Sequence, residues 1–416
     1  MRTAARTAHD LGNAMLAQLY DAVCGESATA KDAYLTWRAP DRTFDASDFD
    51  FCTQGFGVGL DDHARRRLTD QARTVAELVD GPPDARLSTV YADILRRCAV
   101  VRADLSDEEQ LKVEKYRNLL RSTRKLIDPI TGDEREVTDE GPMLKAYRDR
   151  QAAYLAAELC RNLARVTGDA GPDGDGHRSL VCDAMDAWVG SGYRDEVDQV
   201  VAYLDQVGRR DLVLWRRHLV GMFDDALVDD PGGRFHHTTL VPADFATGPS
   251  WFDYTFDPDV LDPRPRVRST SWRAGVADFA FGATAEVGLP GFRVGCRLAQ
   301  VVISRPWFFP EFLHNRGWVL PDGDLVSDGG DPPSGRLVGY PTAVLFVRDL
   351  RISSAEFAAS HRATGGPATW GPFRLAGATV DDTGLTVPGM QAIGFVNRQL
   401  GRVPDPLPEL DQGRFG

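Results

Sequence analysis

The sequence lacks every short motif that would assign a chemistry on its own. It contains no G-x-x-x-x-G-K-S/T phosphate loop, no G-x-S-x-G nucleophile elbow, and neither the H-E-x-x-H nor the H-x-E…C-x-x-C pattern of zinc enzymes. Its six cysteines are scattered, and the closest two, Cys160 and Cys182, are 22 positions apart. That spacing excludes a C-x-x-C metal or redox pair.

Lysine and net positive charge are also scarce. The chain has 48 basic and 61 acidic residues, which gives a formal charge of −13. An acidic balance argues against a dedicated nucleic-acid binder and against electrostatic attraction to an anionic membrane. Among the basic residues only Lys31, Lys112, Lys115, Lys125 and Lys145 are lysines. We interpret this arginine bias as GC-rich coding, so the arginines carry little functional information at this stage.

Long apolar runs are missing as well. No window approaches the 18 apolar residues of a membrane-spanning helix. The N-terminal residues lack the continuous apolar region of a secretory signal, and most cysteines have the apolar neighbours of small buried thiols. We therefore expect a cytoplasmic protein with reduced cysteines.

The residues present predict an α+β protein with two domains. A chain of 416 residues exceeds the usual size of one hydrophobic core. Helical spacing of apolar residues recurs up to the Asp-Asp-Pro-Gly-Gly stretch that ends at 233, whereas β-branched alternation with frequent Gly and Pro follows it. We predict a mainly helical domain over 1–234 and an antiparallel, sandwich-like β-rich domain over 235–416.

The clearest local feature is a long antiparallel helical hairpin. One helix is expected to begin after Ser106 and to run to about Leu126, and another to begin at Pro142 and to continue to about Val166. The segment 127–138 between them carries a Gly-Asp turn, which predicts a small β-hairpin at the tip. The glycines at 55, 57 and 59 resemble a dinucleotide loop but lack the third glycine at the required offset, so a tight connection is the better interpretation.

Three groups of residues are metal candidates. His236 and His237 have imidazole ligands with aspartates nearby, although neighbouring residues of an extended segment point to opposite sides. Two acidic loops have the oxygen ligands that calcium prefers, but neither has a glutamate at the EF-hand distance. The weaker loop contains Asp169, Asp173 and Asp175, and the stronger contains Asp322, Asp324, Asp328 and Asp331. A solvated loop is the alternative interpretation for each.

The segment 303–318 is unusually rich in aromatic residues and arginine. Tryptophan and arginine together are typical of the centre of a protein interface, whereas the same aromatic rings are also typical of a buried junction between domains. We favour the junction and keep the interface as the functional alternative. The candidate interaction residues are Arg305, Trp307, Phe308, Phe309, Phe312, Arg316 and Trp318.

Without a catalytic motif, the leading functional prediction is a non-enzymatic interaction or structural protein, a component or cargo of a larger assembly. We expect a protein partner or self-association, no cofactor and no nucleic acid. One alternative is a membrane-active, pore-forming type of effector, which would expose the amphipathic segment 3–24 and the helical hairpin after a conformational change. The other is a metal-dependent hydrolase that uses His236 and His237.

Overall fold

The computed structural model describes most of the chain. The described residues are 8–24, 32–38, 41–54, 62–80, 86–101, 107–127, 134–167, 174–208, 211–230, 233–259, 273, 291–365 and 368–408. The glycines at 55, 57 and 59 lie outside them, as do Asp169 and Asp173.

Helices dominate the first half of the chain, as the periodicity predicts. The helices are α1 (Ala8–Cys24), α2 (Phe51–Gln54), α3 (Asp62–Asp80), α4 (Leu87–Arg97), α5 (Asp107–Leu120), α6 (Pro142–Thr167), α7 (Gly174–Ser191), α8 (Arg194–Gly208), α9 (Leu212–Asp225), α10 (Pro310–Leu313) and α11 (Ala355–Thr364). Their starts carry recognisable signals. Pro142 takes the first position of α6, and the Asp211 carboxylate caps α9 by accepting a hydrogen bond from the Leu214 amide at 3.0 Å.

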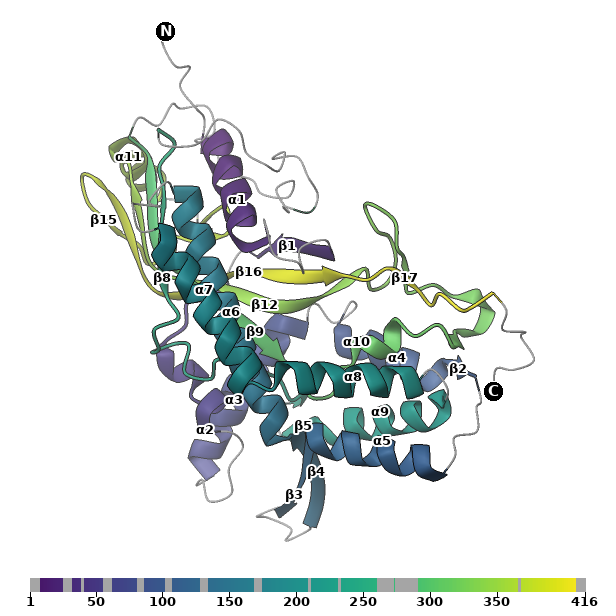
Figure 1. The fold of residues 1–416 in the computed structure, drawn as a ribbon. Coiled ribbons are helices and arrows are strands. Elements are labelled where there is room, and N and C mark those ends of the chain that lie inside the picture. The colour runs from purple at the N-terminus through teal and green to yellow at the C-terminus, as the bar shows by residue number, and fades with distance from the viewer. Residues whose placement is uncertain are drawn as a thin grey trace.

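One antiparallel sheet of seven strands forms the centre of the molecule (Figure 1). Its path is β1 (Ala33–Trp37), β16 (Gly384–Gln399), β12 (Gly339–Ser353), β9 (Arg293–Ser304) and β7 (Thr239–Val241). In addition, β15 (Thr379–Val380) pairs with β16, and β8 (Phe252–Phe256) pairs with β9. The strand β1 comes from the N-terminal part of the chain and runs antiparallel to β16, with Leu35 opposite Val396.

Five two-stranded sheets complete the β structure of the described residues. They are β2 (Ala99–Val100) with β10 (Trp318–Val319), β3 (Arg121–Ile127) with β4 (Glu134–Glu140), β5 (Leu227–Asp230) with β6 (Gly233–His236), β11 (Ser327–Asp328) with β17 (Arg402–Val403), and β13 (Thr369–Trp370) with β14 (Phe373–Arg374). The hairpin of β3 and β4 projects from the lower end of the molecule as Figure 1 shows it.

Both faces of the central sheet are covered, because its long strands alternate apolar side chains in both directions. On β9, Val294 and Leu298 pack with α1 and α6, whereas Val301 packs with the aromatic residues around Phe49 and with α3. A third buried cluster joins α4 and α9 to the segment that follows β9. The mixed α+β prediction is confirmed. The sandwich detail is not, since the main sheet packs against helices and loops and no second large sheet occurs in the described residues.

The helical hairpin differs in detail from its prediction. The helix α5 ends at Leu120 rather than near Leu126, and the strands β3 and β4 extend the tip hairpin to 121–140. The helix that runs back along α6 is α7 (Figure 1). Trp188 near the end of α7 packs on Tyr147 near the start of α6, and His177 near the start of α7 approaches Cys160 further along α6.

The predicted division at residue 234 stays a prediction. Each of the three largest buried clusters contains residues from both sides of it. The N-terminal helix, which the membrane-active alternative would expose after a conformational change, lies in the first cluster. Between Leu11 and Cys24 no side chain of α1 is exposed, and Gln18 is hydrogen-bonded to Tyr254 at 2.9 Å and to the Val166 carbonyl.

Candidate functional site

The aromatic segment after β9 lies mostly in the interior. Trp307, Phe312 and Trp318 are each at most 1% exposed. The indole of Trp307 donates to the His237 carbonyl at 3.0 Å, and that of Trp318 donates to the Phe312 carbonyl at 3.0 Å. Rings with satisfied N–H groups in this position stabilise the fold. In the described conformation they offer no surface to a partner.

The outer members of the same segment behave differently. Arg316 is half exposed and bonds Asp405 through both the backbone carbonyl and the carboxylate. Arg305, Phe308 and Phe309 face a cavity between α6 and the ends of the central strands. The structure therefore separates the seven predicted interaction residues into a buried group, a surface ion pair and a cavity wall.

The acidic loop does not gather its carboxylates. Asp324 pairs with Arg97 at 3.2 Å, and Asp331 pairs with Arg273 at 3.6 Å. Asp328 accepts hydrogen bonds from the Gly330 and Ser334 amides, which lower its pKa. The side chain of Asp322 lies outside the described residues, as does that of Asp175 in the weaker loop. Within the described ranges, no three His, Cys, Asp or Glu residues are close enough to hold a metal.

The two neighbouring histidines differ in the contacts they make. The His236 ring stacks on Phe223 with centroids 4.0 Å apart and lies 5.1 Å from Trp307. Burial lowers the pKa of His236 to about 4, with smaller opposing contributions from Asp80 and Asp224. A neutral imidazole in an aromatic cluster is a packing residue, and His237 contributes its carbonyl to Trp307.

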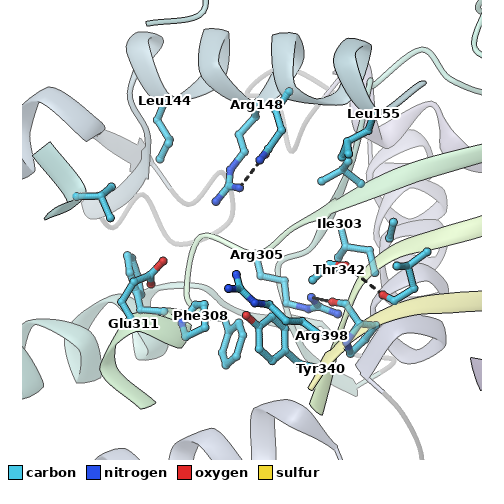
Figure 2. Close-up of a pocket in the computed structure, with 18 of the residues that line it drawn as sticks. Leu144, Arg148, Leu155, Ile303, Arg305, Phe308, Glu311, Tyr340, Thr342 and Arg398 are labelled. Carbon is cyan, nitrogen blue, oxygen red and sulfur yellow. Dashed lines mark hydrogen bonds between the residues drawn. The ribbon is translucent and has the colours of Figure 1, made fainter. Parts of the chain in front are cut away.

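A cavity of about 400 Å³ lies between the helical layer and one end of the central sheet. Its helical wall comes from α5, α6, α8 and α9, and its opposite wall comes from the ends of β9, β12 and β16. Figure 2 shows Arg148 extending from α6 into this space, with Arg305, Arg398 and Tyr340 on the opposite side. A volume of this size is typical of sites for small organic molecules.

One stripe of α6 forms the longest side of the cavity. Leu144, Arg148, Gln151, Leu155 and Leu159 follow each other at steps of three or four residues, so they share one face of the helix. At 1.5 Å per residue, the stripe from Leu144 to Leu159 spans roughly 22 Å. The cavity therefore follows the helix as an elongated groove.

Five arginines line the cavity, and they come from distant parts of the chain: Arg117, Arg121, Arg148, Arg305 and Arg398. The Arg305 guanidinium donates to the Pro341 carbonyl at 2.6 Å and to the Val79 carbonyl at 3.1 Å. Arg148 donates to the Gln151 amide oxygen at 3.3 Å. The guanidinium of Arg121 lies 4.7 Å from the centre of the Phe309 ring. Backbone carbonyls, an amide and an aromatic face thus orient these cations without neutralising them.

Three of these arginines keep a buried nitrogen without a partner. Nη1 of Arg121, Nε of Arg148 and Nε of Arg305 have no hydrogen-bond partner among the described residues. Unpaired buried charge costs several kcal/mol per group in proteins, so such groups generally coordinate an ion or a ligand. Elsewhere in the described residues, Arg42, Arg86 and Arg194 also keep a buried nitrogen without a hydrogen-bond partner, but the three around the cavity border a space in which an anion would supply the missing acceptor.

The carboxylates of the cavity do not meet this demand. Glu140 accepts from the Ser304 hydroxyl at 3.0 Å, and Glu158 accepts from the Tyr154 hydroxyl at 2.9 Å. Glu311 also lines the cavity. In the part of the chain that the structure describes, no carboxylate forms an ion pair with any of the five arginines. Five cations against three anions leave the cavity electropositive inside an acidic protein.

Burial and mutual repulsion shape the protonation states. Burial lowers the pKa of Arg121 to about 10, with Glu140 opposing the shift, and burial also lowers that of Arg305 to about 10. Both arginines stay charged at neutral pH. Burial, together with the neighbouring Arg117 and Arg121, lowers the pKa of His218 to about 4. His218 is therefore a neutral polar group beside the cations.

The sequence interpretation missed this site because its residues are far apart in the chain, with 250 positions between Arg148 and Arg398. One local signal was present: Arg148 stands on the apolar face of a helix between Leu144 and Leu155. Comparison of the chain with protein-family models, curated proteins and solved structures finds no match.

Proposed function

We propose that the protein is a non-enzymatic binding protein for a small organic anion, held in the cavity between α6 and the sheet ends. The supporting observation is the set of three inward arginines, Arg121, Arg148 and Arg305, each with a buried nitrogen that lacks a partner. Guanidinium groups are the best protein ligands for carboxylate and phosphate, because their planar N–H groups match two oxygens at once.

The arrangement of the arginines favours binding over a purely structural role. Arg148 comes from the helical layer, whereas Arg305 and Arg398 come from the sheet layer (Figure 2). An anion between them would contact both walls and relieve the repulsion among the cations. A structural ion pair would instead place a carboxylate of the protein there, as Arg316 and Asp405 do on the surface at 3.1 Å.

The proposed anion site and the interactions with other proteins that the sequence predicts are separate properties. A protein partner or self-association remains a prediction, and the native mass by light scattering is its direct measurement. A cytoplasmic location belongs to the proposal as well. For the membrane-active alternative, no described helix is long and apolar enough to cross a bilayer, and the segment 11–24 would first have to leave the core.

Thermal unfolding with matched anions and neutral amides tests the proposal. Benzoate, butyrate and phosphate are added in series, with benzamide and butyramide as uncharged controls. A ligand that binds only the folded state stabilises it by about 2.7 kcal/mol at a hundred times its Kd, so at least one anion raises the melting temperature where its amide does not.

Two variants locate the effect. Arg148→Gln removes a cavity charge and is expected to lose most of the anion response. Arg66→Gln removes an exposed charge on α3 and is expected to keep it. The proposal is wrong if no anion stabilises the protein more than its amide, or if both variants respond alike.

A further inference from the structure

The cavity is amphipathic along its length, which bears on the kind of anion it takes. Beyond the arginines, towards the C-terminal end of α1, apolar side chains gather in its walls, and the polar groups of Glu158 and Asn162 lie among them. Six residues form this apolar end: Leu155 and Leu159 of α6, Val23 and Cys24 of α1, Val302 of β9, and Val396 of β16. The leucines and valines cannot ionise. Cys24 stays a neutral thiol at neutral pH, because burial raises its pKa to about 12.

The apolar end is a continuation of the same groove. On α6 the step from Arg148 to Leu155 is seven residues, and Leu159 follows one turn later, so all three share the helical face that lines the cavity. At 1.5 Å per residue, Arg148 and Leu159 are roughly 16 Å apart along the axis. Figure 2 shows Leu155 beside Ile303 and Thr342, displaced from Arg148 along the helix.

This geometry fits some anions and disfavours others. Inorganic phosphate would occupy only the arginine end and leave the apolar groove without a partner. A compact polyanion would place charge against Leu155 and Val302, where it loses its hydration without compensation. A linear molecule with one anionic head and an apolar chain would pair with the arginines and lay its chain against the apolar side chains, because each methylene moved from water to the groove contributes favourably.

We infer that the ligand is an aliphatic molecule with a single anionic head group, which lies between Arg148 and the Arg305–Arg398 wall, and with a chain that follows α6 towards Leu159. The inference rests on the proposed anion site and adds its chemical class. Carboxylate and phosphate monoester heads share the recognition chemistry, since guanidinium groups bind both in the same two-pronged way.

Calorimetric titration of the full-length protein with straight-chain carboxylates from butyrate to decanoate tests the inference. All are used below the concentrations at which they form micelles, with inorganic phosphate and octyl phosphate as additional probes. We expect affinity to increase by about fourfold for each added methylene until the chain fills the groove, since one buried methylene contributes about 0.8 kcal/mol. Octanoate or octyl phosphate, whichever binds more tightly, identifies the head group.

A pair of variants checks where the chain lies. Leu155→Asn places an amide of similar size in the apolar end and is expected to flatten the dependence on chain length while butyrate binding changes little. Leu180→Asn, at a position of α7 that is 52% exposed, is the control and is expected to bind like the wild type.

The outcomes separate the two claims. If phosphate and every carboxylate bind equally well, or if Leu155→Asn keeps the full chain-length dependence, the ligand has no aliphatic chain in the groove. The proposed anion site is then still supported. If none of these anions binds, the proposed function itself fails.

Discussion

The two faces of the segment after β9 have opposite chemistry. On one face, Trp307 and Trp318 are fully packed, and each indole N–H has a carbonyl acceptor at 3.0 Å. On the other face, Arg305 borders a cavity of about 400 Å³ and keeps a buried Nε without a partner. Native proteins pair nearly all buried polar groups, so the unpaired Nε of Arg305 contrasts with the paired indole nitrogens of Trp307 and Trp318.

The difference between the two faces suggests that one serves stability and the other the proposed binding. Satisfied aromatic packing contributes to folding whether or not a ligand is present. Buried arginines that lack counter-ions cost stability, and a fold retains such groups where they serve a ligand. We therefore expect substitutions on the aromatic face to change mainly stability, and substitutions on the arginine face to change mainly the proposed anion binding.

The largest expected effect is on the aromatic face. Trp318→Ala is expected to lower the free energy of unfolding by about 4 kcal/mol, because it leaves a large cavity beside Phe312, which in turn packs on Trp215. Urea or guanidinium denaturation measures the change. Leu407→Ala, at an exposed position, serves as the control. A loss below about 1 kcal/mol for Trp318→Ala would contradict the structural role of this face.

The arginine face is tested by coupling across the cavity. Arg148→Gln and Arg398→Gln are each expected to weaken binding of the best anion by ten- to a hundredfold, since charge-assisted hydrogen bonds contribute about 1.5–3 kcal/mol. Both residues are expected to hold the same head group, so the double variant should lose less than the sum of the single losses in free energy. Strict additivity would mean that the two arginines do not share a ligand.

A smaller effect concerns pH and the packed face. In the unfolded chain, His236 takes up a proton near pH 6.5, whereas burial in the fold lowers its pKa to about 4. The stability that its neutral form provides is complete above pH 6.5 and is lost as the pH falls towards 4, with a slope of at most about 1.4 kcal/mol per pH unit.

His236→Phe keeps an aromatic ring against Phe223 and removes the titration. It is expected to make the free energy of unfolding less dependent on pH between 6.5 and 4 than in the wild type. His63→Asn, at an exposed position of α3, is the control. Equal pH dependence in the wild type and His236→Phe would rule out this origin of acid sensitivity.

The smallest expected effect is a gain in stability rather than a loss. Arg148→Met, measured without ligand, is expected to raise the free energy of unfolding on the order of 1 kcal/mol, because an apolar side chain of similar length replaces a charge with an unpaired nitrogen. The same variant should lose anion binding. A gain in stability together with a loss of binding is the expected signature of a functional group. Destabilisation by Arg148→Met would indicate a structural role for the arginine.

Local patterns predicted much of the fold. The α+β composition followed from the change of period near residue 235, and the start of α6 followed from Pro142. The end of α5 was misplaced because Leu126 continues the helical spacing, whereas strand pairing opposite Arg135 holds that residue in β3. Such pairing is a tertiary effect that outweighs local propensity.

The cavity was beyond local reasoning. Its arginines belong to α5, β3, α6, the loop after β9 and β16, and only the fold brings them to one space. Because nearly all basic residues in the chain are arginine, the composition gave no reason to single out these five. The aromatic segment was easier to find, but its separation into a packed face and a cavity wall depends on which helices cover it, and no short pattern encodes that.

The most direct test of the anion site is a crystal structure of the protein with a straight-chain carboxylate that carries bromine at its far end. The anomalous signal of bromine locates the chain end independently of the head group. The account predicts a carboxylate within hydrogen-bonding distance of Arg148 or Arg398 and bromine near Leu155 and Leu159. A ligand found only on the surface, or a bromine lodged among the arginines, would contradict it.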